Sequence, residues 1–165
     1  MKINRAVLLL FFISTGLFLV TLLFYKPIAI KMVDNLTVSN SLKEYKAKIT
    51  SSFKNLNIQT GEKIEIPISI KDISKVNWMV NGLNPIRLNY RTINKRYGIT
   101  TEDVYLDLAH DIRAGETVSI KVTYQAPQEL DYYYIDFDLV QEGITYFKDA
   151  DSKDLVVNIK VIDNK

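Results

Sequence analysis

The sequence predicts an all-β domain, a sandwich of antiparallel sheets, that follows one N-terminal membrane-spanning helix. From residue 46 onward, apolar residues recur at every second position in several short runs, which is the period of strands with one buried face. Gly, Pro, Asn and Asp residues separate these runs, as they do in sandwiches of short strands. Residues 6–25, in contrast, contain no charged residue.

The apolar segment AVLLLFFISTGLFLVTLLFY, at residues 6–25, predicts a transmembrane helix. Its twenty residues would rise about 30 Å as a helix, which matches the hydrocarbon core of a bilayer. A cleaved signal peptide is the alternative, but its apolar core spans about 7–15 residues and ends at small residues, whereas Lys26 and Pro27 follow this segment. We therefore expect an uncleaved signal-anchor. Residues 1–5 would be a short basic N-terminus in the cytoplasm, and the C-terminal domain would lie outside.

Residues 26–45 contain the polar run DNLTVSNS and show no regular period, which predicts a stalk or linker, and residues 46–165 are expected to form the sandwich. Within EKIEIPISI, at residues 62–70, the Ile residues share one face of a strand. Pro67 in this run lacks an N–H, which places the strand near a sheet edge or at a bulge. Similar alternation marks the remaining predicted strands, at residues 86–91, 118–124, 132–139 and 155–162.

The composition excludes several kinds of functional site. The chain has no Cys and one His, His110, so disulfides, thiolate chemistry and multi-histidine metal sites cannot form within it. Residues 46–165 hold 16 Lys and Arg residues and 17 Asp and Glu residues. Proteins that bind a phosphate backbone carry a clear excess of positive charge, so we expect no nucleic-acid partner.

Four segments of the chain carry a resemblance to a known kind of domain. They are Trp78, NPIRLNYR at 84–91, IRAGETVSIKVTYQAP at 112–127 and, most specifically, DLVQEGITYF at 138–147. From about Ile58 to Ile162 the chain is similar to the bacterial immunoglobulin-like module that is often appended to cell-envelope glycosyltransferases. It differs from that family at Asp131 and Tyr146, where Gly and Trp are frequent, and before Trp78, where the family usually carries an Asn and a Gly and this chain has KDISKVNW. The resemblance implies an immunoglobulin-like fold and a cell-envelope setting, and it implies no catalytic residue.

Six residues are expected to have structural roles. Gly143 supplies the backbone freedom for a turn after the strand that ends in DLV. We expect Tyr146 and Phe147 to cover the open end of the sandwich, since buried aromatic residues more often seal a core than serve a site. The other three are Trp78, Tyr133 and Phe137.

Seven side chains on the outward faces of two neighbouring strands form the candidate ligand-binding set. One strand carries Arg87, Asn89 and Arg91, and the other carries Tyr132, Tyr134, Asp136 and Asp138. One interpretation is a set of exposed cross-strand ion pairs between the Arg and Asp residues, each worth only about 0–1 kcal/mol. The sharper hypothesis is a flat sugar-binding platform, in which tyrosine rings cover the apolar side of a pyranose and the charged groups bind its hydroxyls.

Catalysis and metal binding have weaker support. Asp136 and Asp138 would lie about 6–7 Å apart along their strand, which is compatible with paired-carboxylate glycoside chemistry, but no cleft signal accompanies them. His110 and Asp111 could orient a base, yet no motif supplies a nucleophile. The acidic positions from Glu102 onward lack the spacing of a calcium loop. We therefore expect no enzyme activity, no metal site and no cofactor.

Together these features predict a single-pass membrane protein whose extracytoplasmic domain is a non-enzymatic binding or interaction module. The resemblance links it to the assembly or recognition of cell-envelope polysaccharide. Its partners would be an envelope glycan or a membrane-bound assembly protein. The alternative is a structural accessory subunit that a larger membrane complex recruits through the transmembrane helix, and an exported hydrolase is a third interpretation.

Overall fold

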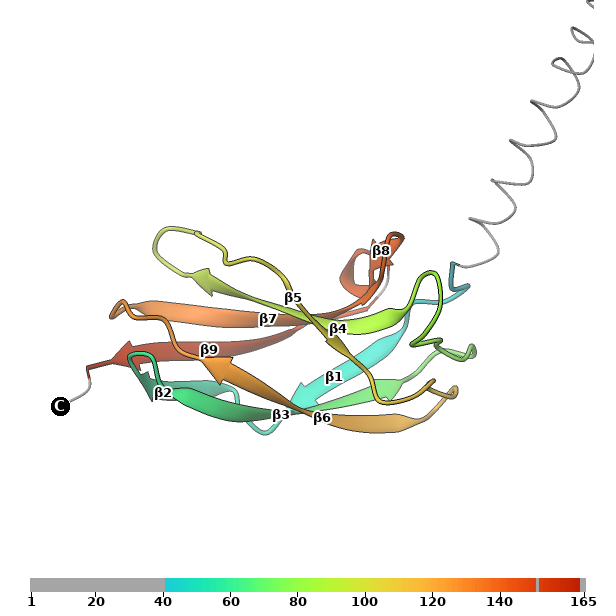
Figure 1. Ribbon diagram of the computed structural model, residues 1–165, viewed down its shortest axis with the longest axis horizontal. Helices are drawn as coiled ribbons and strands as arrows, with labels where there is room; N and C mark the ends of the chain where they lie inside the picture. The colour runs from blue at the N-terminus through green and yellow to red at the C-terminus, as the bar shows by residue number, and fades with distance from the viewer. Residues whose placement is uncertain (1–40, 151, 164–165) are drawn as a thin grey trace, which may run out of the picture. The chain divides into compact units, whose positions relative to one another are not determined.

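The computed structural model describes residues 41–150 and 152–163. Their strands form two layers (Figure 1), which confirms the predicted all-β sandwich. The strands are β1 (Ala47–Ser51), β2 (Asn55–Gln59), β3 (Lys63–Asp72), β4 (Ile86–Asn94), β5 (Val104–Asp107), β6 (Thr117–Gln125), β7 (Tyr132–Gln141), β8 (Thr145–Tyr146) and β9 (Leu155–Ile162). A short 3-10 helix, η1 (Phe147–Asp149), lies between β8 and β9.

The strand order is that of an immunoglobulin-like sandwich. One sheet has the order β1-β3-β6, and the other has the order β2-β9-β7-β4-β5, with β8 added beside β7. Immunoglobulin-type folds pack strands A, B and E against strands G, F and C, and variable-type domains extend the second sheet. The same order is found here. The hydroxyl of Tyr133, at the start of β7, also donates to the Glu129 carbonyl at 3.2 Å, which is the tyrosine corner of such folds.

Alternating side chains from both sheets fill the core. In β3, Ile66, Ile68 and Ile70 are buried, and Phe137 of β7 is fully buried opposite them in the second layer. Pairing between β1 and β3 ends at Ile68, so the first half of β3 has β6 as its sheet neighbour. Pro67 lies at this transition, where a residue without an N–H costs the sheet least.

The residues immediately before β1 belong to the sandwich. Leu42 and Tyr45 pack against the core, and the Tyr45 hydroxyl donates to Gln141 Oε1 at 2.7 Å. The ring of Tyr45 meets Phe147 edge-on, with the centroids 5.2 Å apart. Residues 41–45, which the sequence places in the linker, therefore contribute apolar surface to the domain.

Phe147 fills the end of the core beside Trp78. Both rings are fully buried, and they meet edge-on with their centroids 5.3 Å apart. Trp78 is fixed in turn by two backbone hydrogen bonds with Ile112, of 2.8 and 3.0 Å. Tyr146 precedes Phe147 in an extended segment, where successive side chains point to opposite faces. The prediction that both residues cover the core is therefore corrected, because Tyr146 lies on the outer face of the larger sheet.

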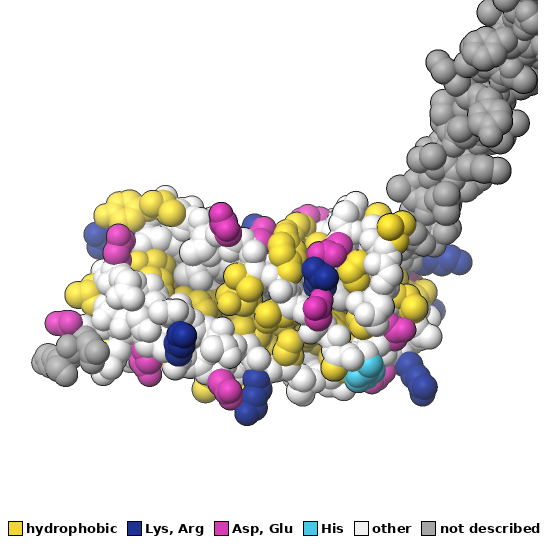
Figure 2. Space-filling model, viewed as in Figure 1, with side chains coloured by type: hydrophobic (Ala, Val, Ile, Leu, Met, Phe, Trp, Pro, Cys, Tyr) yellow, Lys and Arg dark blue, Asp and Glu magenta, His cyan; other side chains and the backbone are white. Residues whose placement is uncertain are grey.

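Figure 2 shows apolar side chains at the surface over the β4–β5 loop and along the seam between β5 and β6, among other places. In the loop, Tyr97 and Ile99 are 62% and 67% exposed. At the seam, a pocket of 340 Å³ is lined in part by Leu108, Val118 and Ile120. This seam joins the free edges of the two sheets, since β5 ends one sheet and β6 ends the other.

The predicted membrane anchor, residues 6–25, lies outside the described residues, as does most of the predicted linker. In the part of the chain that the structure describes, no helix is both long enough and apolar enough to cross a bilayer. The anchor and its orientation stay predictions.

Candidate ligand-binding face

All seven candidate residues lie on the outer face of the larger sheet, where the register of β4 and β7 fixes their neighbours. Arg91 is opposite Asp136, and Asn89 is opposite Asp138. This face has two regions. The covered end consists of Asn89, Arg91, Asp136 and Asp138 with Tyr146 and Lys148 against them. The open end consists of Asn55, Asn57, Lys95, Tyr132, Asn158 and Lys160.

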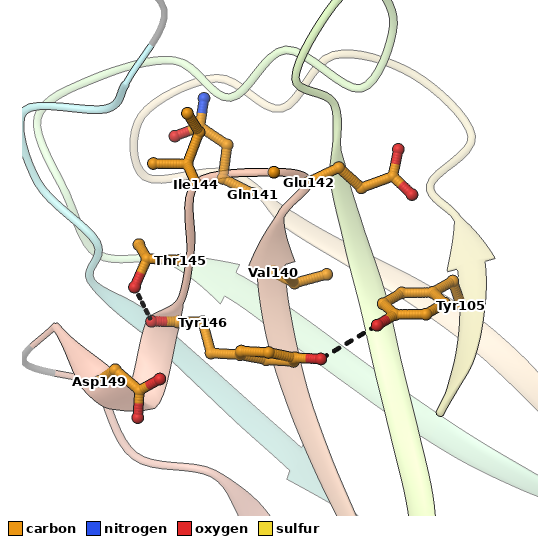
Figure 3. Close-up of a pocket in the computed structure, with 9 residues that line it drawn as sticks. Tyr105, Val140, Gln141, Glu142, Ile144, Thr145, Tyr146 and Asp149 are labelled. Carbon is orange, nitrogen blue, oxygen red and sulfur yellow. Dashed lines mark hydrogen bonds between the residues drawn. The ribbon is translucent and has the colours of Figure 1, made fainter. Parts of the chain in front are cut away.

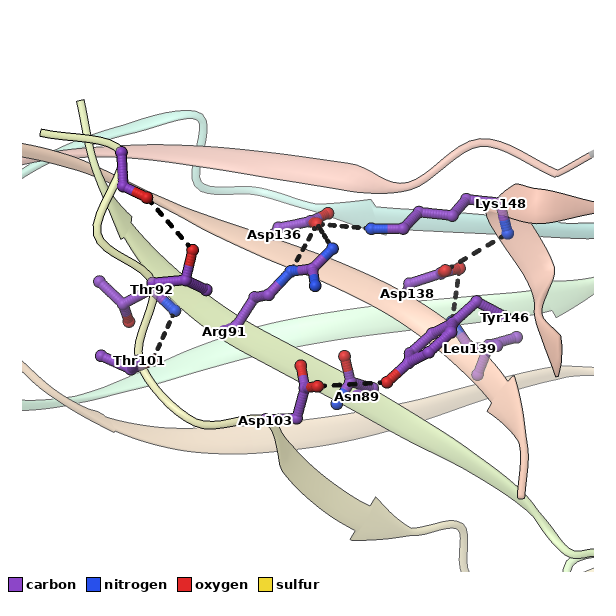
Figure 4. A network of polar contacts seen from close by, with 12 residues as sticks. Asn89, Arg91, Thr92, Thr101, Asp103, Asp136, Asp138, Leu139, Tyr146 and Lys148 are labelled. Carbon is purple, nitrogen blue, oxygen red and sulfur yellow. Dashed lines mark hydrogen bonds and ion pairs between the residues drawn. The ribbon is translucent and has the colours of Figure 1, made fainter. Parts of the chain in front are cut away.

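The covered end owes its cover to the turn at Gly143. This residue has φ of +71°, a conformation that glycine adopts without a steric penalty. The Ile144 N–H donates to the Gln141 carbonyl at 3.0 Å, and β8 then pairs back along β7. The turn predicted from the sequence thus returns the chain beside β7, and η1 places Lys148 on the outer face of the sheet (Figure 4).

Lys148 binds the covered end through its side chain and its backbone. Its Nζ lies 2.8 Å from Asp136 Oδ2, and its backbone N–H donates to Asp138 Oδ2 at 3.3 Å. Arg91 reaches the same oxygen of Asp136 from β4, at 3.1 Å. Figure 4 shows the two cations converging on one carboxylate from different elements. Removing one partner of a buried ion pair leaves the other charge unpaired, which is strongly destabilising. Arg91, Asp136 and Lys148 therefore hold β4, β7 and η1 together only when all three are present.

Tyr146 extends from β8 toward β5 across the same face. Its hydroxyl donates to Asp103 Oδ2 at 3.2 Å and lies 3.0 Å from the hydroxyl of Tyr105. Burial, and then the contacts with Tyr105 and Asp103, raise the pKa of Tyr146. The phenol therefore stays protonated and able to donate.

The cover makes three predicted surface residues interior. The exposed fractions of Asn89, Asp136 and Asp138 are 2%, 5% and 1%. The interpretation as exposed ion pairs is therefore wrong for both Asp residues. The platform hypothesis is wrong for all three, because a sugar on the surface cannot reach them.

The carboxyl groups of the covered end differ in their affinity for protons. Burial raises the pKa of Asp138 to about 6, against the hydrogen bonds from two backbone N–H groups. Burial acts in the same direction on Asp136, but contacts with Lys148, Asp154 and Arg91 together lower its pKa. Burial and the charge of Asp136 raise the pKa of Asp154. Separated pKa values suit acid–base chemistry, yet here Asp136 is paired with Arg91 and Lys148, and Asp138 accepts hydrogen bonds from two backbone N–H groups.

A pocket of 370 Å³ borders the covered end, at the β7–β8 turn (Figure 3). Its lining residues are Tyr105, Val140, Gln141, Glu142, Gly143, Ile144, Thr145, Tyr146 and Asp149. Arg87 lies beside it and forms ion pairs with Asp107 at 2.8 Å and with Glu142 at 2.7 Å. Arg87 is opposite Val140 of β7, so it does not form the predicted pair with either buried Asp.

The open end has a different construction. Register aligns two rows across β2, β9 and β7, namely Asn57–Lys160–Tyr132 and Asn55–Asn158–Tyr134. Tyr132 is 53% exposed, and Lys160 Nζ lies 5.7 Å from the centroid of its ring. A second pocket of 370 Å³ opens here, lined by Asn55, Leu56, Asn57, Lys95, Tyr132, Asn158, Ile159 and Lys160.

Most residues of the open end were not candidates from the sequence. The signal for β2 was present, because NLNIQ at residues 55–59 alternates polar and apolar residues. Its parallel pairing with β9 joins segments about a hundred residues apart, so the approach of Asn55 and Asn57 to Tyr132 could not be read from local spacing.

The described residues do not form the other candidate sites, a His110–Asp111 pair and a metal site. His110 Nε2 lies 2.8 Å from Glu116 Oε1. Asp111, the expected partner of His110, instead accepts the Val80 N–H at 2.9 Å. Within residues 41–150 and 152–163, no group of three or more His, Cys, Asp or Glu side chains could hold a metal ion.

No protein-family model and no curated protein matches the sequence. Among solved structures, the C-terminal domain of wzt is 8% identical, with 72% of this chain and 75% of that chain covered and a TM-score of 0.49. A CARDB domain from Pyrococcus furiosus, in complex with di-metal ions, is 9% identical over 72% of this chain and 93% of its own, with a TM-score of 0.45. Spo0M, a sporulation control protein from Bacillus subtilis, is 15% identical over 70% and 50% of the two chains, with a TM-score of 0.45. These likenesses concern sandwich architecture and carry no conclusion about activity.

Proposed function

We propose that the chain is a membrane-anchored, extracytoplasmic and non-enzymatic binding module that recognises a glycan of the cell envelope through the open end. The observation that carries this proposal is the exposed ring of Tyr132 beside a pocket lined by asparagine side chains. Of the two tyrosines in the predicted platform, Tyr134 lies in the neighbouring row and extends the same surface. The sugar-binding platform is thereby limited to the open end of the sheet face.

The chemistry of the open end suits a sugar. An aromatic ring offers an apolar face to the C–H groups of a pyranose, and each asparagine amide offers both donors and acceptors to its hydroxyls. Among the described residues, the side chains of Asn55 and Asn57 make no hydrogen bond. These amides are therefore available to a ligand without the loss of an internal contact.

The assignment as a non-enzymatic module is supported by the state of the two most plausible catalytic carboxyls. Asp136 and Asp138 are buried and engaged by Lys148, so neither is presented to a bound glycan. A general acid or base must come within hydrogen-bond reach of the proton it transfers.

The test is Tyr132→Ala in the full chain, purified with a non-ionic detergent and measured against a panel of envelope glycans. We expect wild-type binding to at least one glycan and a loss of about tenfold or more in the variant. Tyr97→Ala is the matched control, since Tyr97 is similarly exposed but lies on the β4–β5 loop. The proposal fails if wild type binds no glycan, or if the two variants bind equally well.

Membrane anchoring is tested separately, by mass spectrometry of the mature protein. An intact N-terminus that retains residues 6–25 supports the anchor. A mature chain that begins after Tyr25 removes it and leaves a secreted module.

The accessory-subunit alternative has one observation in its favour. Tyr97, Ile99 and Leu130 are exposed apolar residues, and a pocket lined by both the β4–β5 and β6–β7 loops brings these loops together at one end of the sandwich. Exposed apolar clusters often mark protein contacts. Co-purification of one membrane partner with wild type, but not with Tyr97→Ala combined with Ile99→Ala, would favour this alternative.

A further inference from the structure

Of the described residues, two lysines and no carboxylate line the pocket at the open end. Lys160 lies in the same cross-strand row as Tyr132, with its Nζ 5.7 Å from the ring centroid. Lys95 follows β4, and its Nζ donates to Asn158 Oδ1 at 2.7 Å. An ammonium group has three donors, so Lys95 keeps two of them for a ligand while Asn158 holds its side chain toward the pocket.

The carboxylate next to Tyr132 in sequence does not neutralise these lysines. Asp131 accepts a hydrogen bond from Asn94 Nδ2 at 3.2 Å and lies 3.8 Å from Arg96 Nε. Its backbone and side-chain contacts, with those to Arg96, lower the pKa of Asp131. The carboxylate of Asp131 is therefore engaged by Asn94 and Arg96. The pocket at the open end keeps the positive charge of Lys95 and Lys160.

The other end of the same face has the opposite character. Acidic residues around the covered end are Asp103, Asp107, Asp136, Asp138, Glu142, Asp149 and Asp154, against the cations Arg87, Arg91 and Lys148. An anionic ligand is repelled by a surface with excess carboxylates and attracted by one with excess ammonium groups. The sheet face is thus polarised along its length.

Resting on the proposed function, we propose that the open end selects an acidic saccharide, one that carries a carboxylate or a phosphate. The sugar ring packs on Tyr132, Asn55 and Asn57 bind its hydroxyls, and Lys95 and Lys160 bind the anionic group. Lysine suits both kinds of acid, because its ammonium is a compact point charge without the fork geometry of a guanidinium. The shared requirement is therefore a negative charge on a pyranose.

The experiment compares three trisaccharides that differ at one position: glucose, glucuronate or glucose 6-phosphate as the terminal unit. Each is titrated into the full chain in non-ionic detergent at about 0.05 M and about 0.5 M NaCl, since screening of exposed charges separates the two conditions. The test variant is Lys95→Gln combined with Lys160→Gln. The matched control is Lys71→Gln combined with Lys121→Gln, which removes two exposed charges from the smaller sheet.

We expect an acidic trisaccharide to bind wild type about tenfold more tightly than the neutral one at low salt, with a smaller ratio at high salt. The Lys95/Lys160 variant should bind all three alike, and the control variant should keep the preference. The glucuronate and phosphate arms then identify the acid. Equal wild-type affinity for neutral and acidic sugars, or a preference that survives in the Lys95/Lys160 variant, overturns the inference while the proposed function stands. Failure to bind any of the three also overturns the inference, and the wider glycan panel with Tyr132→Ala then decides the proposed function separately.

Discussion

The outer face of the larger sheet has a covered end around Asp136 and an open end around Tyr132, and both are built on β7. In the covered end, β8 pairs beside β7, and η1 then places Lys148 against the carboxylates of β7. In the open end, β9 and β2 continue the sheet beside β7, and Tyr132 remains 53% exposed. The two ends thus differ in the neighbouring chain segments, and one strand carries both a buried polar layer and the proposed binding surface.

This difference shows how a polar residue on a sheet face acquires its role. The alternation of β7 places Tyr132, Tyr134, Asp136 and Asp138 on one side. Charged groups without solvent must be paired, and Asp136 therefore serves the attachment of η1. Amides and ammonium groups that keep contact with water can exchange it for a ligand. Matched substitutions at the two ends should therefore differ in their effects on stability.

Phe147→Ala is expected to have the largest effect, a loss of about 3–5 kcal/mol in the free energy of unfolding. The ring is fully buried and lies edge-on to both Trp78 and Tyr45, so its removal leaves a cavity and frees the segment that forms the cover. Urea denaturation measures the change. Tyr132→Ala is the control at the open end, with an expected loss of under about 0.5 kcal/mol. Similar losses in the two variants would contradict the distinction between a buried covered end and an exposed open end.

Asp138→Asn should change how stability depends on pH. The folded pKa of Asp138 is about 6, above the ordinary value of 3.8, so the folded state binds the proton more tightly than the unfolded state does. This group therefore contributes stability at about pH 4 that is lost as pH rises to about 6, with a total of about 3 kcal/mol.

The measurement is urea denaturation of wild type and Asp138→Asn at pH 4, 5, 6 and 7. As pH rises across this range, the unfolding free energy of wild type should fall relative to that of the variant, because the variant has no proton to lose. Asp107→Asn is the control, since it makes the same change at a side chain that is 75% exposed, where a charged pair contributes little to stability. Parallel pH profiles for wild type and Asp138→Asn would show that Asp138 is not buried as described.

Tyr146→Phe should have a smaller effect, a loss of about 1 kcal/mol. The substitution keeps the ring and removes the hydroxyl contacts with Asp103 and Tyr105. Tyr132→Phe is the matched change at the open end, where the hydroxyl makes no hydrogen bond among the described residues, and it should leave stability unchanged. Thermal unfolding of the two variants measures the difference, and equal shifts would mean that Tyr146 does not fasten the cover.

The sandwich could be predicted from the sequence because strands and turns leave local patterns in the chain. Alternation in EKIEIPISI and in the run that became β7 identified the strands and their inward faces, and Gly143 identified a turn. The burial of Asp136 and Asp138 could not be obtained in this way, since an alternating strand marks which side faces the core and does not show what lies over the other side. That cover comes from Lys148, which reaches the face only after β8 has paired back on β7.

A saccharide is expected at the open end of the sheet face and not at the covered end. The most direct measurement is a titration of the 15N-labelled full chain with the glucuronate-terminated trisaccharide, followed by NMR of the side-chain amide signals. We expect shifts for Asn55, Asn57 and Asn158, and unchanged signals for Asn89 and Gln141 at the covered end and its pocket. Shifts at Asn89 and Gln141, with the three asparagines of the open end unchanged, would contradict this expectation.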